Sequence, residues 1–247
     1  FPPDKLQTTI TLPPSKSISN RLLILNALSC SPHPIENLSN CEDTQVLIDA
    51  FKSDSNIFDV KGAGTAMRFL TAFLAEMEGE WIIRGNKRMH ERPIYPLVNT
   101  LIALGAEIEY LGKEGYPPLK IKGKHLEGGE VYLSGNMSSQ FVSALLMIAP
   151  KMDKGLIIHL ENEVISKPYI HLTLGLMEKY GVKARWEGKD ISVKHQEYVP
   201  TPIKVEADWS AASYWYSIAS LIPKAEVTLL GLNQNSLQGD SNLVNLF

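Results

Sequence analysis

The sequence predicts an α/β fold assembled from a repeated unit of strand, helix, strand, helix and two further strands. Short β-type runs alternate with helical patterns along the whole chain. Two stretches with this order of elements resemble each other at an offset of about 75 residues, longer than the period of most solenoid repeats. A third round of the same order begins before Phe247.

The first complete unit is preceded by a strand over 8–12 and by helical patterns over 17–29 and 43–52. The second of these helices starts at Asp43, a good N-cap residue. The elements of the unit are expected, in order, at 56–61 (strand), 64–75 (helix), 81–84 (strand), 93–104 (helix), and 107–110 and 119–121 (strands). Pro93 suits the first position of its helix, where a backbone N–H has no intrahelical partner.

The second unit repeats this order. Its elements are expected at 130–133, 138–148, 156–160, 168–180, 182–186 and 190–193. A third round has a strand over 203–206, a helix over 208–221 with Asp208 as N-cap, and a strand over 226–230. It stops before its second helix. Because an incomplete unit leaves apolar faces uncovered, we expect the chain to be a truncated part of a longer protein.

The composition excludes several classes of protein but does not indicate which reaction or ligand this one has. With 24 Lys and Arg against 27 Asp and Glu, the formal charge is −3, so there is no basic excess for nucleic-acid binding. No apolar run approaches the roughly 20 residues that a membrane span needs. Two cysteines, Cys30 and Cys41, provide neither a disulfide framework nor a thiolate metal site. We therefore expect a cytoplasmic protein.

Residues 12–21 join a strand to a helix and contain the most informative group of polar side chains. Free backbone N–H groups at a helix start favour an anion, and Lys16 adds a compact charge there. Arg21 lies one turn after Ser17 on the same face, where its guanidinium can bind a carboxylate or phosphate. Ordinary serine capping with Lys16 and Arg21 in solvent explains the segment about as well.

Two glycine- or arginine-containing segments also precede helices. In 62–68, Gly64 permits close approach of a ligand, although a plain tight turn is equally consistent, and Met67 breaks the dinucleotide-binding pattern. In 88–93, Arg92 is expected at a helix start, where its charge opposes the helix dipole. That placement favours an anionic partner, with an ion pair to Glu91 as the alternative.

The second unit has polar helix starts of its own. Ser138, Ser139 and Gln140 open one helix, and Ser166 opens the next, with Tyr169 in its first turn. The six histidines show no metal-ligand spacing, so we expect structural roles for them and no metal site. Helix starts that converge on one cleft would suit a substrate bearing phosphate and carboxylate groups.

Taken together, six segments in this order resemble the 5-enolpyruvylshikimate-3-phosphate synthase (3-phosphoshikimate 1-carboxyvinyltransferase) family. They are residues 14–21, 63–68, 88–94, 138–141, 166–170 and 205–208. The resemblance implies an enolpyruvyl-transferase-type lobe of βαβαββ units, with helix N-termini facing an interlobe cleft and a second lobe that is incomplete. It also implies transfer of the enolpyruvyl group from phosphoenolpyruvate to the 5-hydroxyl of shikimate 3-phosphate, in aromatic amino acid biosynthesis, without a metal or cofactor.

The resemblance further implies roles for individual residues. Shikimate 3-phosphate would contact Lys16, Ser17, Arg21, Ser138, Ser139, Gln140, Ser166 and Tyr169. Phosphoenolpyruvate would contact Lys16, Gly64, Arg92 and Gln140. The family's proton-transfer residues, an Asp in an Ile-Pro-Asp segment and a Lys-Glu pair in a Lys-Glu-x-Asp-Arg segment, have no counterpart in these 247 residues. We therefore expect no catalytic residue in this chain and no activity from it alone.

On the same basis, residues 14–205 are expected to form a complete shikimate-phosphate-binding lobe, and 1–13 with 206–247 part of a second lobe. The full-length protein is expected to be a monomer that binds these two small molecules and neither nucleic acid nor membrane. Two alternatives stay open: a non-catalytic module that binds anions or sugar phosphates, and the related enolpyruvyl transferase acting on UDP-N-acetylglucosamine. The pair Lys16-Ser17, in place of Lys-Asn, and the lack of a matching loop cysteine argue against the second.

Overall fold

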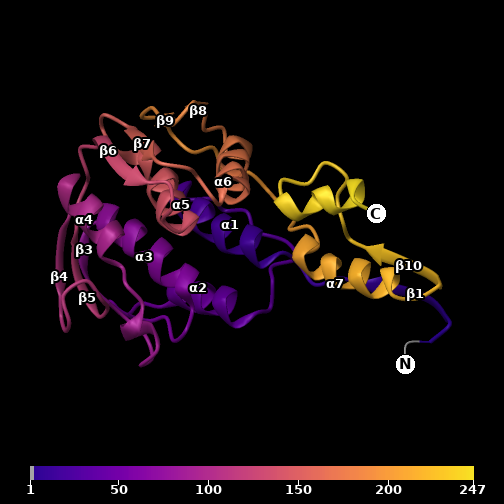
Figure 1. The fold of residues 1–247 in the computed structure, drawn as a ribbon. Coiled ribbons are helices and arrows are strands. Elements are labelled where there is room, and N and C mark those ends of the chain that lie inside the picture. Colours follow the sequence, from indigo (N-terminus) through magenta and orange to yellow (C-terminus); the bar gives the residue numbers. More distant parts are fainter. Residues whose placement is uncertain (1–2) are drawn as a thin grey trace.

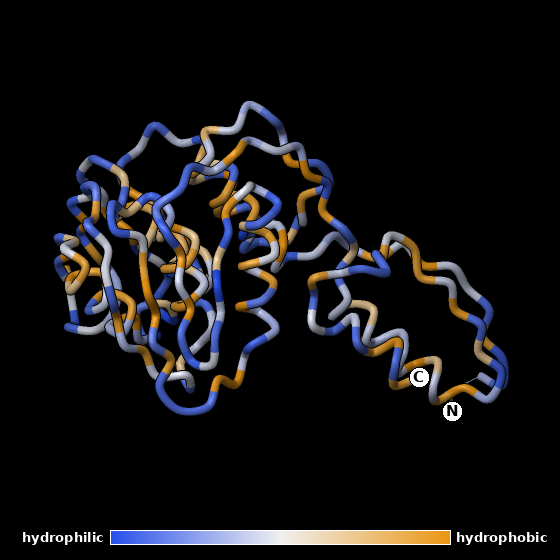
Figure 2. The backbone as a smooth tube through the Cα atoms, turned by 90° about the horizontal axis from the view of Figure 1, so that it is seen from above, coloured by the Kyte–Doolittle hydropathy of each residue, from blue (hydrophilic) through white to orange (hydrophobic). Residues whose placement is uncertain are grey.

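The computed structural model describes residues 3–247, which form a large body and a small body joined by two adjacent segments of chain (Figure 1). The large body contains both predicted repeat units together with the first two helices. The small body contains the beginning and the end of the described chain. Figure 2 shows the narrow connection between the two bodies from above. Residues 1 and 2, the first of the predicted segment 1–13, lie outside the described residues.

The two repeat units have the same sheet topology. In the first, β2 (Ile57–Asp59), β3 (Gly79–Arg84), β5 (Leu119–Gly123) and β4 (Glu107–Tyr110) form a sheet in the order β2-β3-β5-β4. In the second, β6 (Gly129–Ser134), β7 (Leu156–Glu161), β9 (Asp190–Val193) and β8 (Ala184–Glu187) have the order β6-β7-β9-β8. Each sheet has one parallel pair followed by two antiparallel pairs. The repeated unit predicted from the sequence is therefore confirmed.

The two sheets lie at the outer edges of the large body, and its helices lie on their inner side (Figure 1). The first unit contributes α3 (Gly64–Glu76) and α4 (Tyr95–Ala103), and the second contributes α5 (Ser139–Ile148) and α6 (Lys167–Lys179). The large body also contains the two helices that precede these units, α1 (Lys16–Leu28) and α2 (Glu42–Lys52). Short 3₁₀ turns, η1 (Met89–Glu91) and η2 (Ala149–Lys151), complete the units.

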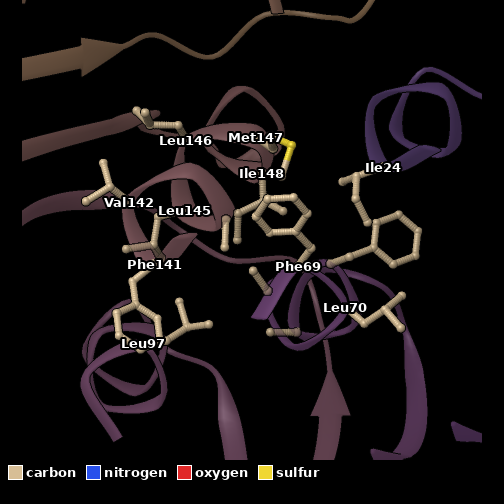
Figure 3. Packing of buried hydrophobic residues seen from close by; sticks show 14 of the residues in the cluster. Ile24, Phe69, Leu70, Leu97, Phe141, Val142, Leu145, Leu146, Met147 and Ile148 are labelled. Atoms are coloured by element: carbon tan, nitrogen blue, oxygen red, sulfur yellow. The ribbon is translucent and has the colours of Figure 1, made fainter. Parts of the chain in front are cut away.

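The core of the large body is centred on α3 and α5, which are buried on nearly every side. Phe69 of α3 lies among Ile24 of α1 and Leu145 and Ile148 of α5 (Figure 3). A helix that is apolar around its whole circumference is stable only when other elements cover it. Both repeat units therefore share one continuous core, and their helix N-termini are held at fixed positions relative to one another.

The small body has few elements. Strands β1 (Lys5–Thr11) and β10 (Lys224–Leu230) pair in parallel, and α7 (Trp209–Ser220) packs beside β10. The 3₁₀ segment η3 (Gly239–Asn245) packs against α7 and also contacts α6 of the large body. Its buried apolar cluster consists of Leu12, Ala207, Trp209 and Ala212. This small cluster is separate from the core of the large body.

The chain passes between the bodies twice, and the two passages are paired. The backbone N–H of Ser15 donates to the carbonyl of Glu206 (2.9 Å), and that of Asp208 donates to the carbonyl of Pro13 (2.9 Å). These bonds place the start of α7 next to the start of α1. The crossing therefore brings two helix N-termini together at the boundary between the bodies.

Two of the predicted elements differ in the structure. The strand expected at 203–206 is only an isolated bridge, because this crossing segment pairs with the single residue Glu36 through Ile203 and Val205 rather than with a sheet. The second helix begins at Glu42, with Cys41 as N-cap, so Asp43 lies in the first turn. A carboxylate in that turn still interacts favourably with the helix dipole.

Within residues 3–247, no helix is long and apolar enough to cross a membrane.

Candidate anion-binding cleft

The N-termini of α1, α5, α6 and α7 open onto one cavity of about 470 Å³. Its lining contains all eight residues for which shikimate 3-phosphate contacts were expected: Lys16, Ser17, Arg21, Ser138, Ser139, Gln140, Ser166 and Tyr169. Asn20, Thr65, Asp208 and Ser210 complete the lining. Segments that are far apart in the sequence thus form a single site rich in hydrogen-bond donors.

Lys16 is the first residue of α1 and lies at the boundary between the two bodies. Its backbone N–H donates to Asp208 Oδ2 (3.3 Å), and its Nζ lies 3.9 Å from Asp43 Oδ2. The N-cap of this helix is Ser15, whose hydroxyl accepts from the N–H of Ile18 (3.5 Å). Since the Lys16 side chain is about half exposed, at 48%, its ammonium group is available to a ligand in the cleft.

Arg21 is buried, and its hydrogen-bond partners are neutral. Its Nε donates to Thr173 Oγ1 (2.7 Å) and its Nη1 to the carbonyl of Ser17 (2.9 Å). Its Nη2 contacts Ser143 Oγ (3.3 Å) and the carbonyl of Tyr169 (3.4 Å). Burial lowers the pKa of Arg21 to about 10, so the guanidinium is still charged at neutral pH. Since no carboxylate pairs with this charge in the described structure, an anion in the cavity would stabilise it.

The start of α5 combines capping with free polar groups. Ser138 is the N-cap and its hydroxyl accepts from the N–H of Gln140 (3.3 Å), so ordinary capping accounts for this serine. Gln140 Nε2 donates to Thr65 Oγ1 (3.2 Å), which links α5 to the start of α3. Ser139, the first residue of α5, also lines the cavity.

The start of α6 provides a hydroxyl and an aromatic ring. Ser166 is the N-cap, but its side chain makes no capping hydrogen bond, so its hydroxyl is not used by the helix. The ring centroid of Tyr169 lies 6.0 Å from the Arg21 guanidinium carbon. With 44% of Tyr169 exposed, its ring forms an accessible part of the cavity wall.

A second cavity of about 640 Å³ adjoins the first. It contains all four residues for which phosphoenolpyruvate contacts were expected: Lys16, Gly64, Arg92 and Gln140. Its other lining residues are Glu42, Asp43, Gly62, Thr65, Asn86, Arg88 and Met89. Lys16, Thr65 and Gln140 line both cavities. The cleft can therefore hold two anionic molecules next to each other, with one lysine and one glutamine between them.

Gly64 and Arg92 are in close contact in the second cavity. A Cβ atom at position 64 would lie 2.3 Å from Arg92 Nη1, so only glycine allows the guanidinium to occupy this place. Beneath them, buried Arg68 donates from Nη1 to the carbonyl of Gly64 (2.9 Å). Burial, with a smaller effect from the charge of Arg92, lowers the pKa of Arg68 to about 10. Two guanidinium groups therefore lie close together at this end of the cleft, whose lining also includes the carboxylates of Glu42 and Asp43.

The expected position of Arg92 at a helix start is wrong. Arg92 follows the 3₁₀ turn η1, and α4 begins three residues later at Tyr95, so Pro93 is not its first residue. The backbone N–H groups of Ile94 and Tyr95 both donate to the carbonyl of Gly115 (2.9 and 3.1 Å), which turns the chain before the helix begins. Arg92 still points into the cleft against Gly64, but the dipole argument does not apply to it.

Several cleft residues were not identified from the sequence. Asn20 and Thr65 lie inside motifs that were recognised, next to the residues that were selected, so their positions on those helices could have indicated them. Arg88 also lies in a recognised segment. Asp43 and Asn86 carried no such signal, because their places in the cleft depend on how distant segments pack.

No histidine of the described residues lines either cavity, and two of them pair with carboxylates elsewhere. His125 contacts Glu76 and Asp153, and His159 contacts Glu130 and Asp190. Within residues 3–247, no group of three or more His, Cys, Asp or Glu side chains is arranged to hold a metal ion.

Comparison with known proteins identifies relatives of this chain. The family model described as EPSP synthase (3-phosphoshikimate 1-carboxyvinyltransferase) matches residues 2–53 and 47–246. A 3-phosphoshikimate 1-carboxyvinyltransferase of Bacteroides fragilis is 51% identical over 246 residues, which cover 99% of this chain and 60% of the relative. One of Haemophilus influenzae is 40% identical over 271 aligned residues, covering 97% of this chain and 62% of the relative. The chain thus spans about 60% of the length of these curated relatives.

A solved structure supports the fold. The EPSP synthase of Acinetobacter baumannii superposes with a TM-score of 0.82 at 21% sequence identity, covering 95% of this chain and 57% of that one. At that level of identity, the likeness concerns the arrangement of elements.

Proposed function

The chain belongs to the EPSP synthase family, and we propose that its cleft binds shikimate 3-phosphate and phosphoenolpyruvate side by side, as part of a 3-phosphoshikimate 1-carboxyvinyltransferase. The observation that carries the proposal is the placement of the expected contacts. All eight proposed shikimate 3-phosphate contacts line one cavity, all four proposed phosphoenolpyruvate contacts line the next, and Lys16 and Gln140 belong to both.

The proposed assignment of the two cavities follows from their charges and donors. The first offers the hydroxyl groups of Ser138, Ser139 and Ser166 together with Arg21, which suits a phosphorylated ring that also has a carboxylate and hydroxyls. The second offers Arg92 and Lys16, which suit a small molecule carrying a phosphate and a carboxylate. Adjacent binding would hold the 5-hydroxyl close to the enolpyruvyl group and remove the entropic cost of bringing them together during reaction.

The charges of the second cavity also suit the chemistry of the transfer. The enolpyruvyl group leaves phosphate behind, and cations close to that phosphate stabilise the negative charge that develops on it. Arg92 and Lys16 would serve in this way. The proton transfers are assigned to the Asp of an Ile-Pro-Asp segment and the Lys-Glu pair of a Lys-Glu-x-Asp-Arg segment, and these 247 residues contain neither segment. The chain alone is therefore proposed to bind substrate without turning it over.

The organisation of the whole protein is proposed from the same family membership. Residues 14–205 would be the complete shikimate-phosphate-binding lobe, and the small body would belong to a second lobe that faces the cleft. The working enzyme would be a cytoplasmic monomer. The free thiols Cys30 and Cys41 suit a reducing compartment.

Calorimetric titration of the 247-residue chain with shikimate 3-phosphate tests the proposal. We expect saturable binding that is lost when unphosphorylated shikimate is used and strongly weakened by Lys16→Ala. Lys113→Ala, on an exposed loop outside the cleft, is the matched control and should bind like the parent. Equal binding of shikimate, or indifference to Lys16→Ala, would refute the assignment of the first cavity.

A further inference from the structure

We propose that Asn20 is a further substrate-binding residue, whose side-chain amide donates a hydrogen bond to an oxygen of the anionic substrate held in the first cavity. This inference rests on the proposed function and adds to it a contact that the motif comparison did not supply. Asn20 lies in α1 between Ser17 and Arg21 and lines the cavity.

The first line of support is an unsatisfied donor. Asn20 is fully buried, and its Nδ2 has no hydrogen-bond partner in the described structure. Buried polar groups are almost always paired, since a donor taken out of water without a partner destabilises the folded state. A buried amide N–H₂ that lines a cavity is therefore a group for which a ligand oxygen is the natural partner.

The orientation of the amide is the second line of support. Thr44 Oγ1, fully buried in the first turn of α2, donates to Asn20 Oδ1 at 2.7 Å. Cys41 Sγ lies 3.3 Å from the same Thr44 oxygen and completes a short chain of polar contacts. Because the amide oxygen is occupied by Thr44, the donor end of Asn20 is the end left for the cavity.

The other buried polar side chains of α1 provide a contrast. Ser19 Oγ donates to the carbonyl of Ser15 (2.8 Å) and accepts from the N–H of Ser39 (3.0 Å). Arg21 has protein partners for all three of its nitrogen atoms. The polar side chains of Ser19 and Arg21 therefore have hydrogen-bond partners within the protein. Asn20 Nδ2 is the exception among those in the described part of α1.

The chemistry of the ligand atom follows from the surroundings. Lys16, Ser17 and Arg21 present cationic and hydroxyl donors to the same cavity, so the group bound there must supply several acceptor oxygens. Phosphate and carboxylate both do so, and shikimate 3-phosphate carries one of each. A neutral donor such as the Asn20 amide would orient the bound anionic group without adding positive charge to the cavity.

Two substitutions at position 20 test the proposal by calorimetric titration with shikimate 3-phosphate. Asn20→Asp keeps an oxygen for the Thr44 hydroxyl but removes the donor, and Asn20→Ala removes the whole amide. We expect each to weaken binding by about tenfold or more, the size of a lost hydrogen bond to a charged group. Thr44→Val, which leaves the Asn20 amide in place but no longer fixed, should weaken binding less than either. Titration of the parent and of Asn20→Ala with inorganic phosphate shows whether the amide contacts the phosphate group of the substrate.

The outcomes separate this inference from the function on which it rests. If the parent binds shikimate 3-phosphate and both Asn20 variants bind within twofold of it, the inference is wrong and the proposed function stands. If the folded parent does not bind, both are wrong. Should both variants fail to fold, NMR of the Asn20 side-chain amide in the parent decides. We expect its N–H₂ signals to shift and to exchange more slowly with added shikimate 3-phosphate, and unchanged signals would overturn the inference.

Discussion

The carboxylate of Asp208 joins the N-termini of two helices that belong to different bodies of the molecule. Its Oδ1 accepts from the N–H of Ala211 (3.1 Å) in α7, and its Oδ2 accepts from the N–H of Lys16 (3.3 Å) at the start of α1. One side chain therefore caps α7 and holds Lys16, one of the residues that line both cavities.

Substituting this residue should weaken the small body first. We expect Asp208→Ala to lower the free energy of unfolding by about 1 kcal/mol, because α7 loses its N-cap. Urea unfolding followed by tryptophan fluorescence measures this, since Trp209 and Trp215 lie in α7. Asp54→Ala, at an exposed loop aspartate, is the control and should change stability by less than about 0.5 kcal/mol. Equal stability of the two variants would contradict the capping role.

Arg21 should matter more for binding than for folding. Replacing it by methionine removes a buried charge, while Thr173 Oγ1 keeps its hydrogen bonds to Ser143 Oγ (2.8 Å) and to the carbonyl of Tyr169 (2.9 Å). We expect Arg21→Met to bind shikimate 3-phosphate at least about tenfold more weakly, the effect of losing a charged hydrogen bond. Its thermal midpoint without ligand should stay close to that of the parent. A variant with a clearly lower thermal midpoint that still binds shikimate 3-phosphate like the parent would contradict this prediction, because Arg21 would then serve folding and not binding.

Gly64→Ala should disturb the second cavity selectively. The added Cβ would lie 2.3 Å from Arg92 Nη1 and force that guanidinium to move. We expect phosphoenolpyruvate, titrated in the presence of saturating shikimate 3-phosphate, to bind about tenfold more weakly, with little change for shikimate 3-phosphate itself. Gly112→Ala, whose Cβ would meet only Pro118 Cδ at 3.5 Å, is the matched control. The account fails here if the two alanine variants bind phosphoenolpyruvate equally well.

A histidine outside the cleft predicts a pH dependence of stability. His125 contacts Asp153 Oδ1 and Glu76 Oε1, both at 2.8 Å. Hydrogen bonding to Asp153, with the nearby Glu76, raises the pKa of His125 above its ordinary value of 6.5. Burial raises the pKa of Glu76 above its ordinary 4.5. Since both groups bind protons more tightly in the folded state, the contribution of this pair to stability is greatest at low pH and declines as pH rises.

Urea unfolding between pH 5 and pH 8.5 measures that dependence. We expect the free energy of unfolding to decline from about pH 6 upward, as the folded protein loses the His125 proton. Because this side chain is half exposed, the effect is screened by solvent. His125→Ala should flatten the curve above pH 6 and leave ligand binding unchanged, since His125 does not line either cavity. An equal slope in parent and variant would refute the assignment.

The chain alone should not catalyse the transfer. With both substrates present, we expect phosphate release no faster than in a blank, because the proposed proton-transfer residues are not among these 247 residues. Addition of a full-length relative to the same mixture is the positive control. Release above the blank would show that residues in this chain supply the acid and base.

The sequence predicted the local features of this fold better than its long-range contacts. The repeated order of strands and helices was readable from periodicity, and the capping residue Asp208 from its residue type. The strand expected at 203–206 was wrong because its pairing partner, Glu36, lies in a distant loop. The position of Arg92 was wrong because the carbonyl of Gly115, itself distant in sequence, sets the start of α4.

The same limit applies to the site. Motif positions predicted which helix starts would face the cleft, but no local pattern shows that Asp208 caps Lys16, a residue 192 positions away. Nor does it show that Thr44 fixes the amide of Asn20, because that contact depends on how α2 packs against α1.

The most direct test of the central claim is to map where shikimate 3-phosphate binds, by NMR chemical-shift changes in the isotope-labelled chain. The account predicts that the largest changes fall on the backbone amides at the starts of α1, α5 and α6, around Lys16, Ser139 and Lys167. Titration with shikimate should leave these amides largely unchanged. Changes confined to other surfaces, or equal changes with both compounds, would contradict the claim that these helix starts form a phosphate-dependent binding site.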